Sequence, residues 1–183
     1  MSEELLDQAC SRHLTFRTLI EAGETWRRVR LPNLPQQPET WAALRGLAEG
    51  ILDPVIKEFG PIKVTYGFAS RALTRHIPGR IDPSRDQHAG HELRLDGKPI
   101  CSRQGQAVDF VTSNICSGRI ASWIVTHLPF DRLYFYGPEK PLHVSMGPEG
   151  ARAVVLMMDG PSGRRVPRRK PASWLVEQYG VTT

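Results

Sequence analysis

Hydrophobic residues recur at helical spacing through the first third of the chain. From Trp41 to Ile56 they follow one face of a helix, after an opening proline at Pro38. The pattern stops at Phe59-Gly60-Pro61, where glycine and proline end the helix. Pro54 lies inside the run and lacks the backbone N–H that a helix interior needs. We therefore expect a kink, or a second short helix, from Pro54 onward.

Runs that alternate between apolar and polar residues predict strands further along the chain. The predicted strands cover residues 62–68, 107–111, 132–136, 142–146 and 153–158, and further helices cover 15–23, 120–128 and 172–179, with a short helix or frayed start over 1–12. An Asp96-Gly97 turn predicts a small hairpin between 93–95 and 99–101. This order of elements predicts an α+β fold: a single domain with a small, mainly antiparallel sheet and flanking helices.

The chain divides into three predicted regions. Residues 1–30 form an N-terminal helical segment, 31–160 form the core, and 161–183 hold a basic segment and a C-terminal helix. Within the core, 74–104 is rich in Arg, Pro, Gly and His and is predicted to be an irregular insert, either a lid over the site or a disordered loop. At 183 residues and 40% hydrophobic content, the chain is long and apolar enough to bury one core.

Positive charge indicates an acidic partner. The net charge is +5 and the isoelectric point is near 9.4. Nucleic acid, a phosphorylated small molecule and an anionic cell wall all fit this excess. Much of it lies between Arg164 and Lys170, which is either a solvated basic tail or a binding patch.

Cysteine usage and the first residues bear on location. The three cysteines lack the spacing of a metal knuckle, which fits a reducing compartment. The acidic N-terminus has no apolar signal core, and no apolar stretch is long enough to span a bilayer. We expect a cytoplasmic protein as synthesised, while delivery to a cell wall through a separate pore stays open.

Candidate chemistry lies on two of the predicted strands. Asp109 stands among apolar residues, where a carboxylate is costly unless it is paired with an arginine or bound to a metal. His143 on its strand is either a metal ligand or a packed core histidine, and His88 and His91 are candidates for a further ligand. Two histidines and one aspartate suffice for a catalytic zinc, which takes three protein ligands and keeps a fourth position for water.

Six short segments occur in an order that resembles a known family. They are Asn33-Leu34-Pro35, Ile51-Leu52-Asp53-Pro54, Phe59-Gly60-Pro61-Ile62, Val64-Thr65-Tyr66-Gly67-Phe68, Gly105-Gln106-Ala107-Val108-Asp109-Phe110 and His143-Val144. Over residues 31–146 this order resembles the M15 metallopeptidases, the zinc D-Ala-D-Ala carboxypeptidases and related phage lysins. The fourth segment looks like the family's Thr-Ser-Gly-Tyr-Arg-Ser strand, and the fifth like the end of its S-x-H-x-x-G-x-A-x-D motif. The resemblance implies the fold shared with hedgehog signalling domains and a bacterial or phage origin.

The resemblance implies a set of zinc ligands. Asp109 and His143 fall on the family's ligand positions. The family's first histidine lies seven residues before the aspartate, where this chain has Ser102. If an insertion splits the motif, His88 supplies the ligand, with His91 as the alternative.

The family's catalytic acid and its substrate clamp are both displaced here. The acid usually stands three residues before the last histidine, where this chain has Lys140, so Glu139 is the expected general base. The arginine that clamps the substrate carboxylate is replaced by Ala69, and Arg71 is expected to take its place. Both departures indicate an altered substrate or a relative without peptidase activity.

Three functions follow. The first is a zinc hydrolase that cuts an amide, with a peptidoglycan stem peptide or another small anionic substrate as the default. The second is a cytoplasmic zinc protein of the same fold that binds or acts on nucleic acid or nucleotides; the Arg-rich insert and the 164–170 run favour it. The third is a metal-free interaction module.

Overall fold

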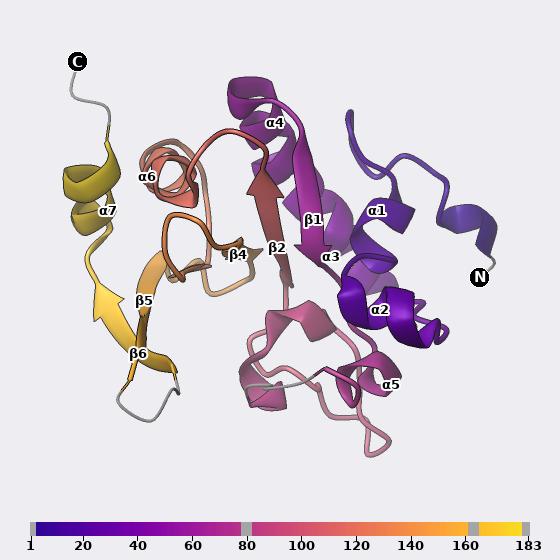
Figure 1. Ribbon diagram of the computed structural model, residues 1–183. Coiled ribbons are helices and arrows are strands. Elements are labelled where there is room, and N and C mark those ends of the chain that lie inside the picture. Colours follow the sequence, from indigo (N-terminus) through magenta and orange to yellow (C-terminus); the bar gives the residue numbers. More distant parts are fainter. Residues whose placement is uncertain (1–2, 78–81, 161–164, 181–183) are drawn as a thin grey trace.

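A single sheet with helices on its flanks organises the molecule, seen in a computed structural model that describes residues 3–77, 82–160 and 165–180 (Figure 1). In chain order the elements are η1 (Glu3–Leu5), α1 (Phe16–Ile20), α2 (Glu24–Val29), α3 (Pro38–Leu47), η2 (Ala48–Leu52), α4 (Asp53–Phe59), β1 (Ile62–Tyr66), α5 (Arg71–Thr74), η3 (Pro83–Arg85), η4 (Gln87–Ala89), β2 (Gln106–Thr112), α6 (Ser117–His127), β3 (Arg132–Phe135), β4 (Leu142–Met146), β5 (Ala153–Asp159), β6 (Arg165–Lys170) and α7 (Ala172–Tyr179). The predicted α+β class, with one mainly antiparallel sheet, is confirmed.

The sheet has six strands in the order β1-β2-β4-β3-β5-β6. Neighbouring strands run antiparallel except β3 and β5, which run parallel. Strands β3 and β4 form a hairpin at the centre of the sheet, and β2 pairs with the other side of β4. The register sets Asp109 directly opposite His143, so both side chains lie on the same face.

The other face of the sheet carries the hydrophobic core. Alternate residues of the central strands, such as Phe110, Val144 and Leu133, are fully buried there and join one cluster with residues of α1, α3, η2, α4 and α6. Strand alternation therefore separates an apolar face under the helices from a face that is free to carry polar groups.

Proline interrupts the long helix as predicted. The helix runs as α3 to Leu47, passes through one π-helical turn from Ala48 to Leu52, and continues as α4. Pro54 lies in the first turn of α4, where its missing N–H costs nothing.

The 82–104 region is irregular, as predicted, yet it is firmly attached. The buried Glu92 carboxylate accepts hydrogen bonds from the backbone N–H groups of Gln36 and Gln37 and from the Thr40 hydroxyl, at 2.9–3.1 Å. It thereby caps α3 with a negative charge at the favourable end of the helix dipole. The predicted hairpin is present as a single bridge between Leu93 and Pro99.

Several elements differ from the sequence predictions, among them α2, α5 and β6. Residues 24–29 form a short helix, α2, that no pattern indicated, and the predicted basic tail contains the edge strand β6, which pairs with β5 along its whole length. The residues of β6 do not alternate between apolar and polar, so the sequence pattern did not predict a strand there. Arginine and proline are both tolerated on an edge strand. Arg164 lies outside the described residues.

Within the described ranges, no helix is both long and apolar enough to cross a membrane.

Candidate metal centre

One row of side chains crosses the polar face of the sheet. Register pairs place Tyr66 of β1 opposite Asp109 of β2, Asp109 opposite His143 of β4, and His143 opposite Tyr134 of β3. Directly opposite residues project to the same face. The sheet thus presents one carboxylate and one imidazole side by side between two phenol rings.

The η4 turn brings His88 to this row. Gln87, which is buried, anchors the turn: its amide nitrogen donates to the Asp131 carboxylate and the Gln104 carbonyl, both at 2.8 Å, and its amide oxygen accepts from the Ser145 hydroxyl at 2.8 Å. These bonds fasten the turn to the end of the β3–β4 hairpin. His88 therefore meets its partners through a fixed backbone and not through a loose loop.

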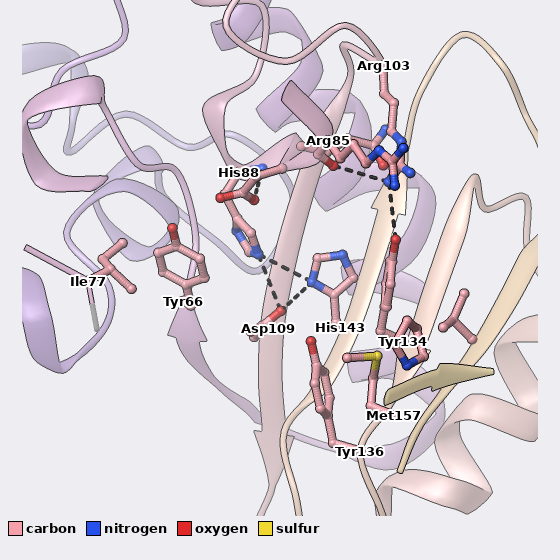
Figure 2. Close-up of a pocket in the computed structure, with 14 residues that line it drawn as sticks. Tyr66, Ile77, Arg85, His88, Arg103, Asp109, Tyr134, Tyr136, His143 and Met157 are labelled. Carbon is pink, nitrogen blue, oxygen red and sulfur yellow. Dashed lines mark hydrogen bonds and ion pairs between the residues drawn. The ribbon is translucent and has the colours of Figure 1, made fainter. Parts of the chain in front are cut away.

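Three ligand atoms converge at the centre of the pocket (Figure 2). His143 Nδ1 lies 2.7 Å from Asp109 Oδ1, His88 Nε2 lies 3.4 Å from the same oxygen, and the two histidine nitrogens are 3.3 Å apart. Zinc bonds of about 2.0–2.1 Å in a tetrahedron place ligand atoms about 3.3 Å apart. Two of the three separations match that value, and the third, at 2.7 Å, would have to lengthen by about 0.6 Å.

The second nitrogen of His88 fixes its ring. Nδ1 lies 2.8 Å from the Gly67 carbonyl oxygen, which can only accept, so Nδ1 carries a proton and donates it there, and Nε2 is the nitrogen that faces Asp109 and His143. Such a carbonyl partner is the usual orienting group behind a zinc-bound histidine. Gly67 itself is required because a Cβ atom there would lie 1.9 Å from the Leu19 carbonyl oxygen.

The cluster stabilises positive charge. Burial alone would raise the pKa of Asp109, but the charges and hydrogen bonds of His143 and His88 outweigh burial and hold that pKa well below its ordinary value. Burial would lower the pKa of His88, and the Asp109 carboxylate reverses this, so the pKa of His88 is raised. Burial and the same carboxylate raise the pKa of Tyr136. A metal cation bound among these ligand atoms would be stabilised by the same negative charge of Asp109.

His91, the alternative ligand, serves the fold. Its Nε2 accepts a hydrogen bond from the Gly105 backbone N–H at 3.1 Å, which holds the chain just before β2. The structure therefore brings His88, and not His91, to Asp109 and His143.

The two residues predicted to be catalytic lie elsewhere. Glu139 is exposed in the turn between β3 and β4, and Arg71 is exposed at the start of α5. Neither lines the pocket that holds the cluster. Glu139 lies in the turn closed by the Lys140 N–H and the Gly137 carbonyl, outside the strands whose register aligns the cluster, and Arg71 is exposed at the first position of α5.

The pocket has a volume of about 510 Å³, and apart from His88, Asp109 and His143 its lining residues were not predicted as site residues from the sequence. It is lined by Tyr66, Ile77, Arg85, Asp86, Gln87, His88, Arg103, Asp109, Tyr134, Tyr136, His143, Val155, Met157 and Pro167. Arg103 reaches across the mouth and donates hydrogen bonds to the Tyr134 hydroxyl and the Arg85 carbonyl, both at 3.1 Å (Figure 2). Only the alternation of Tyr134 and Tyr136 along a predicted strand could have signalled these residues in advance.

Comparisons with known proteins add no relative. No family model, no curated protein and no solved structure matches this chain.

Proposed function

We propose that His88, Asp109 and His143 form a catalytic zinc centre and that the protein is a zinc-dependent hydrolase resembling the M15 metallopeptidases. The observation that carries the proposal is the convergence of two imidazole nitrogens and one carboxylate oxygen, within 3.4 Å of one another, on the floor of an open pocket. Three protein ligands with room beside them are the donor set of a catalytic zinc and not of a closed structural one.

Each residue has a defined part in this centre. His88 and His143 would supply neutral nitrogens to the metal, and Asp109 would supply a negatively charged oxygen. Zinc bound there would lower the pKa of a bound water to about 7 and polarise a substrate carbonyl. Gly67 fixes the tautomer of His88 from behind, so the ligand atom is already oriented before metal arrives.

The order of the segments supports an M15-like, hedgehog-like arrangement of this centre. Asp109 and His143 occupy the positions that the resemblance assigns to ligands, and they are direct neighbours on paired strands. The resemblance makes a peptide amide, such as that of a peptidoglycan stem, the default scissile bond. Arg103 and Arg85, which line the pocket, would take the place of the exposed Arg71 as cations beside a bound substrate.

Hydrolysis of a stem peptide that ends in D-Ala-D-Ala tests this function. Zinc-loaded protein should release the terminal amino acid, a chelator should stop the reaction, and added zinc should restore it. Asp109→Asn should abolish turnover, while His127→Ala, which removes an exposed histidine of α6, should retain it. Zinc-loaded protein that cleaves neither this peptide nor purified peptidoglycan would contradict the peptidase assignment.

A further inference from the structure

Arginines flank the metal pocket on two sides. Arg103 and Arg85 line it from the segment before β2, and β6 borders it from the other side through Pro167. On β6, Arg169 pairs in register with Val155, which also lines the pocket, so the Arg169 side chain projects to the pocket face.

Arg165 lies on the same face as Arg169. Its guanidinium carbon is 4.7 Å from the centre of the Tyr136 ring, and Tyr136 lines the pocket. Arg169 stands four positions after Arg165 along β6, which places their backbones about 13 Å apart. Two cations at that spacing contact separate anionic groups of one extended molecule and not a single small anion.

Acidic side chains offset part of this charge. Asp82 lies 3.7 Å from the Arg85 guanidinium, and Asp159 faces Arg165 in the register. Asp86 also lines the pocket, and Asp82 acts electrostatically on Arg103 as well as on Arg85, so the attraction rests most on Arg169, with Arg165 and Arg103 next. We use the name arginine groove for the channel bordered by Arg85, Arg103, Arg165 and Arg169.

Aromatic rings line the pocket that Arg85 and Arg103 border on one side and Arg165 and Arg169 on the other. Tyr66, Tyr134 and Tyr136 all line the pocket, and the Tyr66 ring lies tilted by 36° against His88 with ring centres 3.8 Å apart. A basic channel with interleaved aromatic rings is the pattern by which proteins bind single-stranded nucleic acid: cations follow the phosphates and rings receive the bases. An anionic wall polymer would use the cations but has no planar groups for the tyrosines.

We propose that the arginine groove binds single-stranded nucleic acid across the mouth of the metal pocket. The arginines and tyrosines that make the groove are not metal ligands, so this binding does not depend on the proposed hydrolysis. The protein would then hold its hydrolytic centre against a nucleic-acid strand.

Neighbouring arginines of β6 provide a matched pair for the test. Arg168 pairs in register with Leu156, which packs against the core, so Arg168 projects to the face opposite Arg169. Arg168→Ala and Arg169→Ala remove the same charge from the same exposed strand. Only Arg169→Ala removes it from the groove.

Fluorescence anisotropy with a labelled oligo(dT) of about 12 nucleotides measures the binding. Wild type should bind with an affinity that falls with salt, and the slope should decrease by about 0.7 for each groove arginine that is lost. Arg165→Ala/Arg169→Ala should weaken binding roughly tenfold at low salt, while Arg168→Ala stays near wild type. Zinc content and melting temperature of each variant, measured alongside, show that fold and metal centre are intact.

Three results would overturn the proposal. One is zinc-loaded wild type that does not bind the oligonucleotide at low salt. Another is an equal loss of affinity in Arg168→Ala and Arg169→Ala, which would show diffuse attraction to a basic surface. The last is a protein that does not bind the oligonucleotide but sediments with purified peptidoglycan, and that loses this sedimentation in Arg165→Ala/Arg169→Ala. That result would assign the groove to a wall polymer. If wild-type protein contains no zinc but still binds the oligonucleotide, the proposed hydrolase function is contradicted and the proposed nucleic-acid binding is not.

Discussion

His88 and His91 stand three residues apart and have separate tasks. His88 Nε2 faces Asp109 and His143, while His91 Nε2 accepts the Gly105 backbone N–H. Substitution of His88 by Ala should lower zinc affinity at least 100-fold, because it removes a ligand and not an orienting group. His91→Gln should change it only a few-fold. Competition with a chromophoric chelator measures both; equal losses would show that the η4 turn is misassigned.

Asp109 makes the metal-free protein sensitive to acid. Its pKa is lower in the folded chain than its ordinary value of about 3.9, so its stabilisation is complete above that value and is lost as the pH falls below it. Between pH values of about 5 and 3, the free energy of unfolding should decrease more steeply in wild type than in Asp109→Asn. Urea titrations of chelator-treated protein across this range give the two slopes. Identical slopes would mean that the carboxylate is not held by the histidines.

The sequence supports prediction of two ligands but leaves the third open. Asp109 and His143 stand in alternating runs, where the period of two shows which residues share a face. His88 and His91 lie in an irregular segment that has no period, so only the tertiary contacts of Gln87 decide which histidine turns inward. Glu139 and Arg71 were inferred from spacing in a resemblance, and spacing does not say which way a turn presents its side chains.

The η4 turn is the element on which the centre depends. Gln87→Ala would leave the buried Asp131 carboxylate and the Ser145 hydroxyl without this partner, at a cost of about 1–3 kcal/mol in the free energy of unfolding. Zinc affinity should fall about 10–100-fold, as for loss of an orienting residue. Calorimetric zinc titration and urea unfolding measure the two effects.

Gln36→Ala is the matched control for Gln87→Ala. Its side chain is exposed and donates a hydrogen bond to the nearby Leu34 carbonyl at 3.0 Å. Zinc affinity and stability should both remain close to wild type. If Gln87→Ala behaves like this control, the turn is held by contacts other than those of its glutamine.

Elements with a clear period were predicted, and elements without one were not. The sequence pattern predicted β4 and α7 with their observed bounds, because apolar residues on them must face a neighbour. Strand β6 carries exposed arginines and gains its place from backbone pairing with β5, which leaves no trace in hydrophobicity. The sequence pattern therefore predicted the strand that carries His143 but not β6, which carries Arg165 and Arg169. The arginine groove could be recognised only from the strand register.

At the scale of the whole molecule, the proposed zinc joins segments that are far apart in the chain. His88 comes from the irregular segment, Asp109 from β2 and His143 from β4, on the face of the sheet opposite the core. A ligand that binds only the folded state stabilises it, by about 2.7 kcal/mol when free zinc is 100-fold above its dissociation constant. For a chain of this size that is a rise in melting temperature of roughly 5–10 °C.

Calorimetry with zinc and with chelator tests this stabilisation. Wild type should show the rise, and His143→Ala should melt at the same temperature under both conditions. A rise that persists in His143→Ala would place the stabilising metal outside the cluster.

The most direct test of the central claim is the zinc content of the purified protein after dialysis against zinc-free buffer. Wild type, His88→Ala, Asp109→Ala and His143→Ala are compared with His127→Ala, whose histidine is exposed. The cluster predicts one zinc per chain in wild type and His127→Ala and none in the three ligand variants, each checked for folding by circular dichroism. Wild type that stays free of zinc after reconstitution, or ligand variants that retain it, would contradict the zinc centre.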